Sequence, residues 1–248
     1  LGRFVLRRLW QMIPVLFLVS VAVFAIIHLI PGNPAEIIAG PNATEEQLQA
    51  LNKRLGLDQP LTTQYAIWLG NVLTGDLGVS FINKYPVSKI IAQRIPATLE
   101  LAFAAAIIGV LIAFPLGILA AIRPGSIFDF ATTTLSALAF AVPGFFVLVL
   151  LIVLFSVRWQ LLPPSGRPPF ADDPVLHLKS LILPAVTLGI GVAARLMRYL
   201  RSSLLEVLDQ DYVRTARAKG LRGRLVMMRH SLPNALIPVV TILGLQLA

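Results

Sequence analysis

Residues 209–238 read DQDYVRTARAKGLRGRLVMMRHSLPNALIP, a basic stretch that separates two strongly apolar runs. Asp209 or Asp211 can cap the first turn of a helix, because a short carboxylate accepts hydrogen bonds from the free N–H groups there. No residue between Asp211 and Gly220 breaks a helix, and Gly220 can end one. The stretch therefore predicts a short helix, a glycine turn and a second basic helix that enters an apolar span at about Leu232–Pro233.

The composition is typical of a polytopic membrane protein. Hydrophobic residues make up 56% of the 248 residues, charged residues make up 13%, and the mean hydropathy is +0.80. A soluble domain carries about 25% charged residues. The chain has no cysteine, which excludes a disulfide framework and a thiolate metal site. Basic cytoplasmic loops explain the net charge of +9, and we do not expect nucleic acid to be a partner.

Five apolar runs are long enough to cross a bilayer or to begin to do so. The first, Leu9–Ile30, has 22 residues, and about 20 residues span the hydrocarbon core. We interpret it as a retained span, because it is too long for the apolar region of a signal peptide and no small-x-small cleavage site follows. The third predicted span, Phe128–Val157, is long enough to be tilted or broken. The other four predicted spans are Ala97–Ile122, Phe128–Val157, Leu181–Leu208 and Leu232–Ala248, and each of the five contains a proline: Pro14, Pro115, Pro143, Pro184 and Pro238.

Residues 31–96 are too mixed in character to span a membrane. Pro31–Pro34 ends the first helix abruptly, and Thr44 provides a capping signal for a short helix through about Leu55. Residues 62–73 predict another amphipathic helix, and residues 75–78 predict a turn. We therefore expect a folded extramembrane segment and not a linker.

The distribution of lysine and arginine predicts the orientation. With a cytoplasmic N-terminus, residues 1–8, 123–127 and 195–231 lie inside and hold 13 of the 21 basic residues. The domain organisation that follows has three parts. These are residues 1–30, a cytoplasmic tip and the first span; residues 31–96, an extracytoplasmic segment; and residues 97–248, a core membrane domain truncated at its C-terminus, with a cytoplasmic loop at about 205–231.

The ionisable residues of the spans do not suggest ion coupling. Glu100, Asp129 and Arg195 lie within about two turns of a predicted span end, whereas ion-coupled transporters place such groups at mid-depth. Arg195, Arg198 and Arg201 have a three-residue spacing, and we expect them along one side of a helix that leaves the bilayer. We expect His28 to be a hydrogen-bonded residue at the membrane interface.

Enzymatic chemistry is not predicted either. The three histidines His28, His177 and His230 fall in different topological zones, so neither a Ser-His-Asp hydrolase nor a metal site is supported. The sequence has no Gly-Lys-Ser/Thr motif, so a phosphate-binding loop is absent from it. We therefore assign no catalytic residue, and we expect another subunit to supply the energy if this chain moves a substrate uphill.

A polar path is predicted beside the proline of the third span. The candidate lining residues are Thr133, Ser136, Pro143 and Gly144. Packing of neighbouring helices through small residues is the alternative interpretation of the same pattern.

The basic stretch resembles the cytoplasmic loop of bacterial ABC-importer permeases, whose signature is Glu-Ala-Ala, three residues, Gly, nine residues, Ile-x-Leu-Pro. With the sequence aligned on Gly220, the second alanine of the signature falls on Ala216 and Leu-Pro falls on Leu232–Pro233. The chain departs from the signature at three positions: Arg214 replaces Glu, Thr215 replaces Ala and His230 replaces Ile.

The run Asp211–Leu221 is typical of the dipeptide/oligopeptide branch of that family. The resemblance covers essentially the whole chain and implies an all-α, type I ABC-importer transmembrane subunit. It also implies that the fifth span is incomplete and that a sixth follows Ala248. Further similar segments are His28 with Pro31-Gly32-Asn33-Pro34 (Asp is commoner at 33), Leu55–Asp58, Gly75–Gly78 and Gly125–Asp129.

The resemblance also implies partners and a location, the bacterial inner membrane. The partners are a second homologous permease, two cytoplasmic ATPase subunits and an extracytoplasmic substrate-binding protein. ATP and magnesium bind the ATPases, and no cofactor is expected in this chain.

In that family the loop forms a coupling helix that docks on an ATPase. Tyr212 and Leu221 can supply apolar anchors there, while basic side chains pair with acidic groups at the rim. The implied coupling residues are Asp211, Tyr212, Arg214, Thr215, Ala216, Arg217, Lys219, Gly220, Leu221, Leu232 and Pro233.

Several alternatives stay open from the sequence. The basic loop can merely set the topology or contact anionic lipid. The chain can also be an ion-coupled transporter or channel without an ATPase, or a scaffold that recruits a soluble partner. Di- or oligopeptides are the expected substrates, with nickel chelates, glutathione and oligosaccharides as alternatives.

Overall fold

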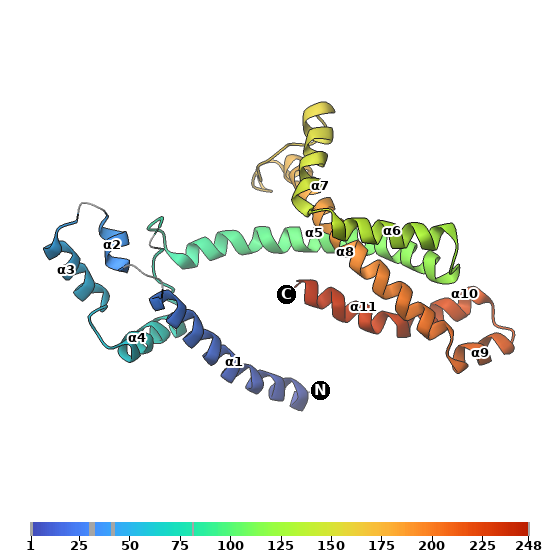
Figure 1. Ribbon diagram of the computed structural model, residues 1–248, viewed down its shortest axis with the longest axis horizontal. Coiled ribbons are helices and arrows are strands. Elements are labelled where there is room, and N and C mark those ends of the chain that lie inside the picture. Colours follow the sequence, from blue (N-terminus) through green and yellow to red (C-terminus); the bar gives the residue numbers. More distant parts are fainter. Residues whose placement is uncertain (1, 30–32, 41–42, 81, 248) are drawn as a thin grey trace. The chain divides into compact units, whose positions relative to one another are not determined.

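The computed structural model describes residues 2–29, 33–40, 43–80 and 82–247 (Figure 1). Within these ranges the regular elements are helices, and the only β-pairing is an isolated bridge between Val79 and Pro86. The predicted all-α class is confirmed. The elements, with η marking wider π-helical turns, are α1 (Gly2–Leu29), α2 (Pro34–Ala39), α3 (Glu45–Leu55), α4 (Leu61–Leu73), α5 (Val87–Ile122), α6 (Ile127–Ala141), α7 (Gly144–Leu151), η1 (Ile152–Arg158), α8 (Pro174–Leu208), α9 (Asp211–Ala218), α10 (Gly223–Val226), η2 (Met227–Ser231) and α11 (Leu232–Leu247).

The chain folds as two compact units, Leu1–Ile95 and Pro96–Ala248. In the first unit, α1 and α4 contact each other through aromatic rings, with the Phe24 and Tyr65 centroids 5.4 Å apart in an edge-to-face pair. The Tyr65 hydroxyl also hydrogen-bonds Ser20 Oγ at 2.8 Å. His28 Nε2 lies 3.2 Å from Gln64 Oε1, so the predicted hydrogen-bonded histidine is confirmed.

Local signals in the first unit form the predicted elements. The Thr44 hydroxyl accepts from the Gln47 N–H, and the Gln47 side chain accepts from the Thr44 N–H, which is a complete capping box. Gly56 ends α3 with a left-handed φ of 70°. In the predicted 75–78 turn, the Asp76 carboxylate accepts from the Gly78 N–H at 2.9 Å. The predicted helix end at Pro31–Gly32 lies outside the described residues.

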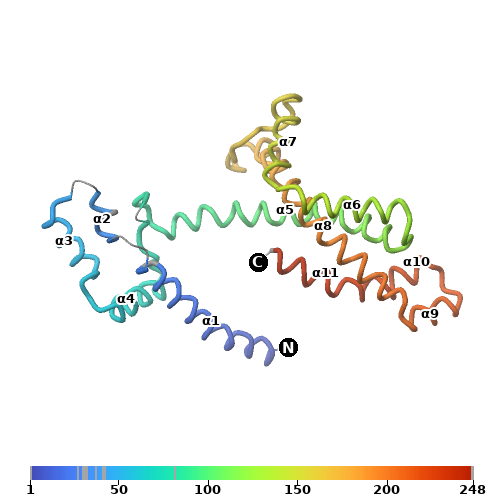
Figure 2. The backbone as a smooth tube through the Cα atoms, viewed as in Figure 1, coloured from blue at the N-terminus to red at the C-terminus, as the bar shows by residue number. Residues whose placement is uncertain are grey.

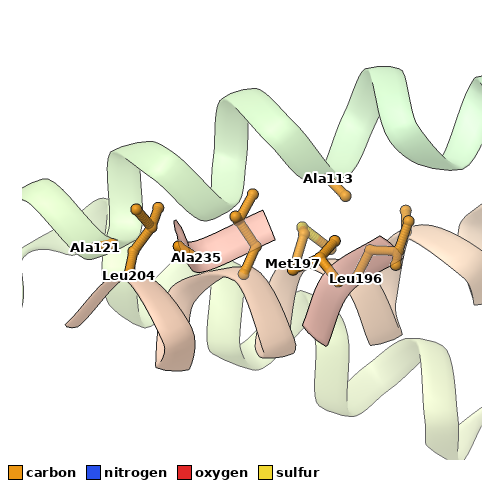
Figure 3. Close-up of a cluster of buried hydrophobic side chains, with 9 residues drawn as sticks. Ala113, Ala121, Leu196, Met197, Leu204 and Ala235 are labelled. Carbon is orange, nitrogen blue, oxygen red and sulfur yellow. The ribbon is translucent and has the colours of Figure 1, made fainter. Parts of the chain in front are cut away.

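Helix α8 is the centre of the second unit, where it packs against α6, α7 and α11. The core combines α8 leucines and Met197 with alanines of α5 and α11 (Figure 3). Small side chains on the neighbouring helices leave room for the large α8 side chains, so the three backbones approach closely. The buried residues of this core are Ala113, Ala121, Ala193, Leu196, Met197, Leu200, Leu204, Ala235 and Val239.

Helices α5 and α8 cross where Gly109 faces Gly189. A Cβ built on Gly109 would lie 2.5 Å from Val192 Cγ1 and 3.2 Å from the Gly189 carbonyl oxygen. A Cβ on Gly189 would lie 2.8 Å from Ile108 Cγ2. Glycine at both positions is therefore required for this close crossing.

We expect Gly109→Ala to destabilise the second unit by about 1–3 kcal/mol, because the added methyl group pushes α5 away from α8. The matched control is Gly191→Ala on α8, where a built Cβ meets no described atom within 4 Å. Thermal unfolding of the purified proteins in detergent measures both. Equal midpoints for the two variants would contradict the role given to this crossing.

Among the described residues, four helices are long and apolar enough to cross a membrane, or five with α6 and α7–η1 counted as one bent span. They begin earlier than the sequence predicted. Helix α5 begins at Val87 and not at Ala97, because proline is tolerated where neighbouring groups accommodate it and the helix continues through Pro96. Helix α8 begins at Pro174 and not at Leu181, because Asp173 caps it, accepting from the Leu176 N–H at 2.9 Å, and proline suits the first helical position.

The predicted third span, Phe128–Val157, is broken and not merely tilted. Residues 127–141 and 144–158 meet at an angle of 99° (Figure 2). Pro143 disfavours the α conformation at Val142, whose ψ is 123°, and the Pro143 ψ is 135°. The extended pair ends α6 and redirects the chain into α7.

Candidate docking helix and membrane cavities

The inner face of α9 is fixed by a small apolar core. Val213 is fully buried, Ala216 is 7% exposed, and both pack with Val226 of α10. Leu221 and the last turn of α8 pack against the same core. A helix of eight residues is marginal alone, so this packing stabilises α9.

Gly220 ends α9 as the sequence predicted. Its φ is +78°, and within the described residues a built Cβ meets no atom within 4 Å, so the backbone conformation alone requires glycine. The Leu221 N–H donates to the Ala216 carbonyl at 3.3 Å, and the Gly220 N–H donates to that of Arg217 at 2.9 Å. These two bonds form a Schellman motif, which satisfies the last carbonyls and aims the chain toward α10.

The predicted N-cap was wrong. Gln210 is the N-cap, with extended backbone, while Asp209 caps the end of α8 and Asp211 is the first residue of α9. Asp209 instead pairs with Arg214 at 2.8 Å, and both side chains are largely exposed. Asp211 still lies in the first turn, where a carboxylate favours the helix dipole.

The outer face of α9 carries the predicted polar residues. Tyr212 is 44% exposed, and its hydroxyl accepts from Asn234 Nδ2 of α11 at 3.0 Å. The predicted coupling residues of the 211–221 segment therefore divide into an inner pair, buried Ala216 and partly buried Leu221, and an exposed set. The exposed set is Asp211, Tyr212, Arg214, Thr215, Arg217, Lys219 and Gly220.

The second basic helix and the last span form one continuous helical run from Gly223 to Leu247. The predicted entry at Leu232–Pro233 is therefore a position inside that run. Pro233 lacks an N–H and its ring crowds the carbonyl of Arg229 four residues earlier. The wider π-helical turn Met227–Ser231 lies directly before this position and includes Arg229, so it relieves the crowding.

A partly buried ion pair joins the first turn of α6 to α8. Arg201 Nε lies 2.5 Å from Asp129 Oδ1, and Arg201 Nη2 lies 2.8 Å from Oδ2. Asp129 is 6% exposed and also accepts from the Gly125 N–H at 2.9 Å. Sequence reasoning missed this pair, although the predicted topology puts both residues at the cytoplasmic ends of their spans.

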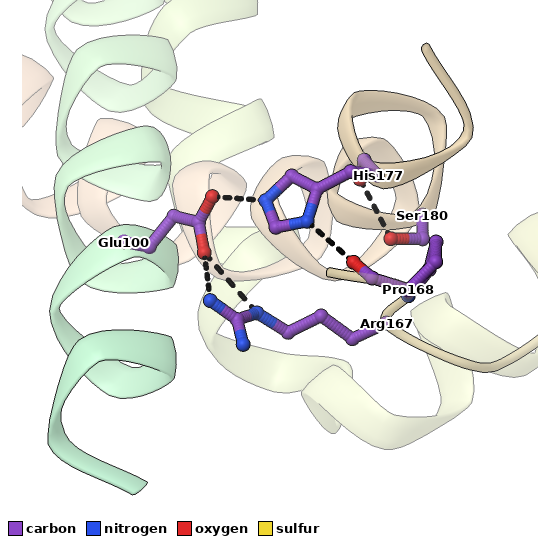
Figure 4. A network of polar contacts seen from close by, with 5 residues as sticks. All are labelled: Glu100, Arg167, Pro168, His177 and Ser180. Atoms are coloured by element: carbon purple, nitrogen blue, oxygen red, sulfur yellow. Dashed lines mark hydrogen bonds and ion pairs between the residues drawn. The ribbon is translucent and has the colours of Figure 1, made fainter. Parts of the chain in front are cut away.

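A second network ties α5 to the proline-rich segment before α8 (Figure 4). Arg167 Nη2 lies 2.6 Å from Glu100 Oε2, and His177 Nε2 contacts the other Glu100 oxygen. His177 is 2% exposed, and its Nδ1 lies 2.7 Å from the Pro168 carbonyl oxygen. Sequence reasoning missed this contact, because a loop brings His177 to Glu100, 77 residues away.

The four predicted path residues line two different cavities. Thr133 and buried Ser136 line a cavity of about 390 Å³, together with Arg198, Arg201 and Ser202. Pro143 and Gly144 line another of about 780 Å³, formed by α5, the α6–α7 break, α8 and α11. The break separates the two sets.

The three arginines of α8 do not share one environment. Arg195 lines the larger cavity, Arg198 stacks over the Phe140 ring at 5.0 Å, and Arg201 pairs with Asp129. At 3.6 residues per turn, each step of three residues rotates the side chain by about 60° around the helix. The three side chains are therefore spread around α8 and do not form the predicted single row.

Two family models match the chain. One, described as "Binding-protein-dependent transport system inner membrane component", matches residues 113–248. The other, "Binding-prot-dependent transport system membrane comp, N-term", matches residues 1–102. The chain belongs to this family. The resemblance to ABC-importer permeases is confirmed, and the protein is a multi-pass membrane component of a binding-protein-dependent transport system.

Similar proteins of bacteria are named as permeases of transport systems. A putative peptide transport system permease protein of Brucella suis is 42% identical over 240 residues, covering 97% of this chain and 76% of the relative. The glutathione transport system permease protein of Escherichia coli O6:H1 is 41% identical over 243 residues, covering 98% and 77%. The dipeptide transport system permease protein of Escherichia coli K12 is 40% identical over 268 residues, covering 98% and 79%.

Proposed function

We propose that this permease forms half of the translocation path of an ATP-driven importer of di- or oligopeptides. The substrate class comes from relatives at 40–42% identity that are named for peptide and dipeptide transport. The partners follow from the same family: a second permease, two cytoplasmic ATPases and an extracytoplasmic binding protein. The chain itself contributes no catalytic group to this cycle, and ATP with magnesium binds the ATPases.

The observation that carries the proposal is the construction of α9. Its inner face is packed, its end is closed by the Schellman motif, and its outer face presents Tyr212 with basic side chains. A short helix held this way moves as a rigid body with α8 and α11, to which it is tied by the Val213 core and by the Tyr212–Asn234 hydrogen bond. It suits a groove with an apolar floor and an acidic rim.

The orientation is part of the proposal. The positive-inside rule supports a cytoplasmic N-terminus, with α9 on the same side. Residues 31–96 then lie outside, where they can meet the binding protein. Deleting Thr44–Leu55 tests that contact: unchanged docking of the binding protein would exclude this segment from the interface.

Nucleotide-sensitive cross-linking tests the coupling role. The cysteine-free sequence allows a single cysteine at Ala218, which is exposed at the end of α9. We expect this variant, assembled with its ATPase subunits, to cross-link to the ATPase with a yield that changes on ATP addition. Ala216→Cys is the matched control, because Ala216 faces the inner core and is 7% exposed. Well-folded complexes with no cross-link at Ala218 or its exposed neighbours would overturn the coupling role.

Two further experiments separate the alternatives. Uptake that survives a catalytically inactive ATPase partner would favour an ion-coupled transporter or channel. In reconstituted vesicles, competition among a dipeptide, an oligopeptide, glutathione, a nickel chelate and an oligosaccharide identifies the substrate. Glutathione is included because one relative at 41% identity is named for it.

A further inference from the structure

The larger cavity of the second unit has the size and lining of a small-molecule site. Its volume is about 780 Å³, within the range of about 300–1,000 Å³ that such sites occupy. Most of its wall is apolar, made of alanine, leucine, valine and phenylalanine side chains beside Pro143 and Gly144. The polar side chains of the wall are Thr187, Arg195 and Gln246. This cavity can therefore hold an apolar body with a few polar ends.

Among the described residues that line this wall, Arg195 is the charged one. Among the described residues its guanidinium has no carboxylate partner; its printed contact is Nη1 to Gln246 Oε1 at 3.4 Å. Arg201, by contrast, is neutralised by Asp129. An arginine in a membrane segment without an internal counter-charge indicates a functional site whose ligand supplies the charge.

Gln246 adds an amide donor to the same wall. Its Nε2 is buried and has no hydrogen-bond partner within the part of the chain that the structure describes. Because its Oε1 faces Arg195, the amide presents N–H groups beside the guanidinium. Thr187 donates its own proton to the Leu183 carbonyl at 2.8 Å. The wall thus offers an excess of donors near one positive charge.

The position of Arg195 along α8 favours a path ligand over a lipid headgroup. The helix continues for 13 residues beyond Arg195, to Leu208, which puts Arg195 about 20 Å from the helix end at 1.5 Å per residue. This distance exceeds the two turns from a span end that the sequence predicted. Arg198 and Arg201 lie closer to that end of the helix.

We propose that Arg195, assisted by Gln246, binds the C-terminal carboxylate of the peptide in this cavity, with the apolar wall around its side chains. Guanidinium groups bind carboxylates with two parallel hydrogen bonds. The inference rests on the proposed peptide substrate and deepens it, because it assigns the recognised chemical group and the residue that recognises it.

The test uses a reporter cysteine in the wall, Thr187→Cys, in the otherwise cysteine-free chain. Membrane fragments with the assembled transporter are treated with N-ethylmaleimide in the presence of a dipeptide or the same dipeptide with an amidated C-terminus. We expect the dipeptide to protect the cysteine, and the amide to need about tenfold or higher concentration, because it lacks the charge-assisted bonds. Adding Arg195→Gln should abolish this preference, and Arg195→Lys should retain part of it.

The matched control is Arg198→Gln, one turn along α8 and outside this cavity, which should leave the preference unchanged. Three results would overturn the inference. They are an unchanged preference in Arg195→Gln, reactivity that follows the anionic lipid content and not the peptide, and a cysteine whose reactivity no peptide changes. ATP-dependent peptide uptake by wild-type transporter, measured separately, distinguishes failure of this inference from failure of the proposed function.

Discussion

Val213→Asp should abolish ATP-dependent uptake while the protein still inserts into the membrane. Val213 is fully buried between α9, α10 and the end of α8. An unpaired carboxylate there costs about 3 kcal/mol or more, which lowers the population of ordered α9 about 100-fold. The spans are untouched, so expression and membrane fractionation should match the wild type. Uptake in reconstituted vesicles and the stimulation of ATP hydrolysis by loaded binding protein measure the effect.

Thr215→Asp is the matched control for this prediction. Thr215 lies two residues further along the same helix but is exposed, so it carries the same new charge outside the core. We expect uptake to fall only moderately, through a changed contact with the ATPase. Wild-type uptake in Val213→Asp would show that the packing of α9 is not required for coupling.

Asp129→Asn should destabilise the second unit more than removal of any surface charge pair. It leaves Arg201 without its counter-charge and weakens the bond from the Gly125 N–H, which together cost about 2–4 kcal/mol. This cost is smaller than the roughly 3–5 kcal/mol for breaking a fully buried pair, because the Arg201 side chain is 31% exposed. Thermal unfolding of the purified transporter, followed by tryptophan fluorescence, measures the loss.

Two companion variants make this prediction specific. The double variant Asp129→Leu, Arg201→Met should recover most of the stability, because it removes both charges and keeps apolar volume. Arg214→Ala, which breaks the exposed pair with Asp209, should change stability by less than about 1 kcal/mol. If the double variant were less stable than Asp129→Asn, the charge of Asp129 would not explain the loss.

The sequence predicted the local elements well where the signal is local. The Thr44 capping box, the Gly56 and Gly220 helix ends and the all-α class depend on a few adjacent residues, and the structure has them as predicted. The family resemblance also rested on a local motif, with Gly220 and Leu232–Pro233 at a defined spacing. The capping box and the glycine helix ends follow from backbone preferences that act within about one helical turn.

Helix starts were predicted less well. A hydropathy pattern marks where apolar residues begin, but the polar first turns of α5 and α8 continue the same helices. The break at Pro143 was one of two possibilities that the length of the third span left open. Proline is compatible with a kinked continuous span or with a stop, and only the backbone at Val142 decides between them.

The sequence by itself determined the class of this protein, its family and the short basic helix, because composition, caps and a spaced motif are properties of neighbouring residues. Only the tertiary structure decided which charges meet: Asp129 with Arg201, Glu100 with Arg167 and His177, and Arg195 with the cavity wall. Those contacts join residues 51 to 77 positions apart. Their distances depend on how α8 packs against its neighbours, and the glycines and alanines that permit this packing carry no mark in the sequence of which helix they face.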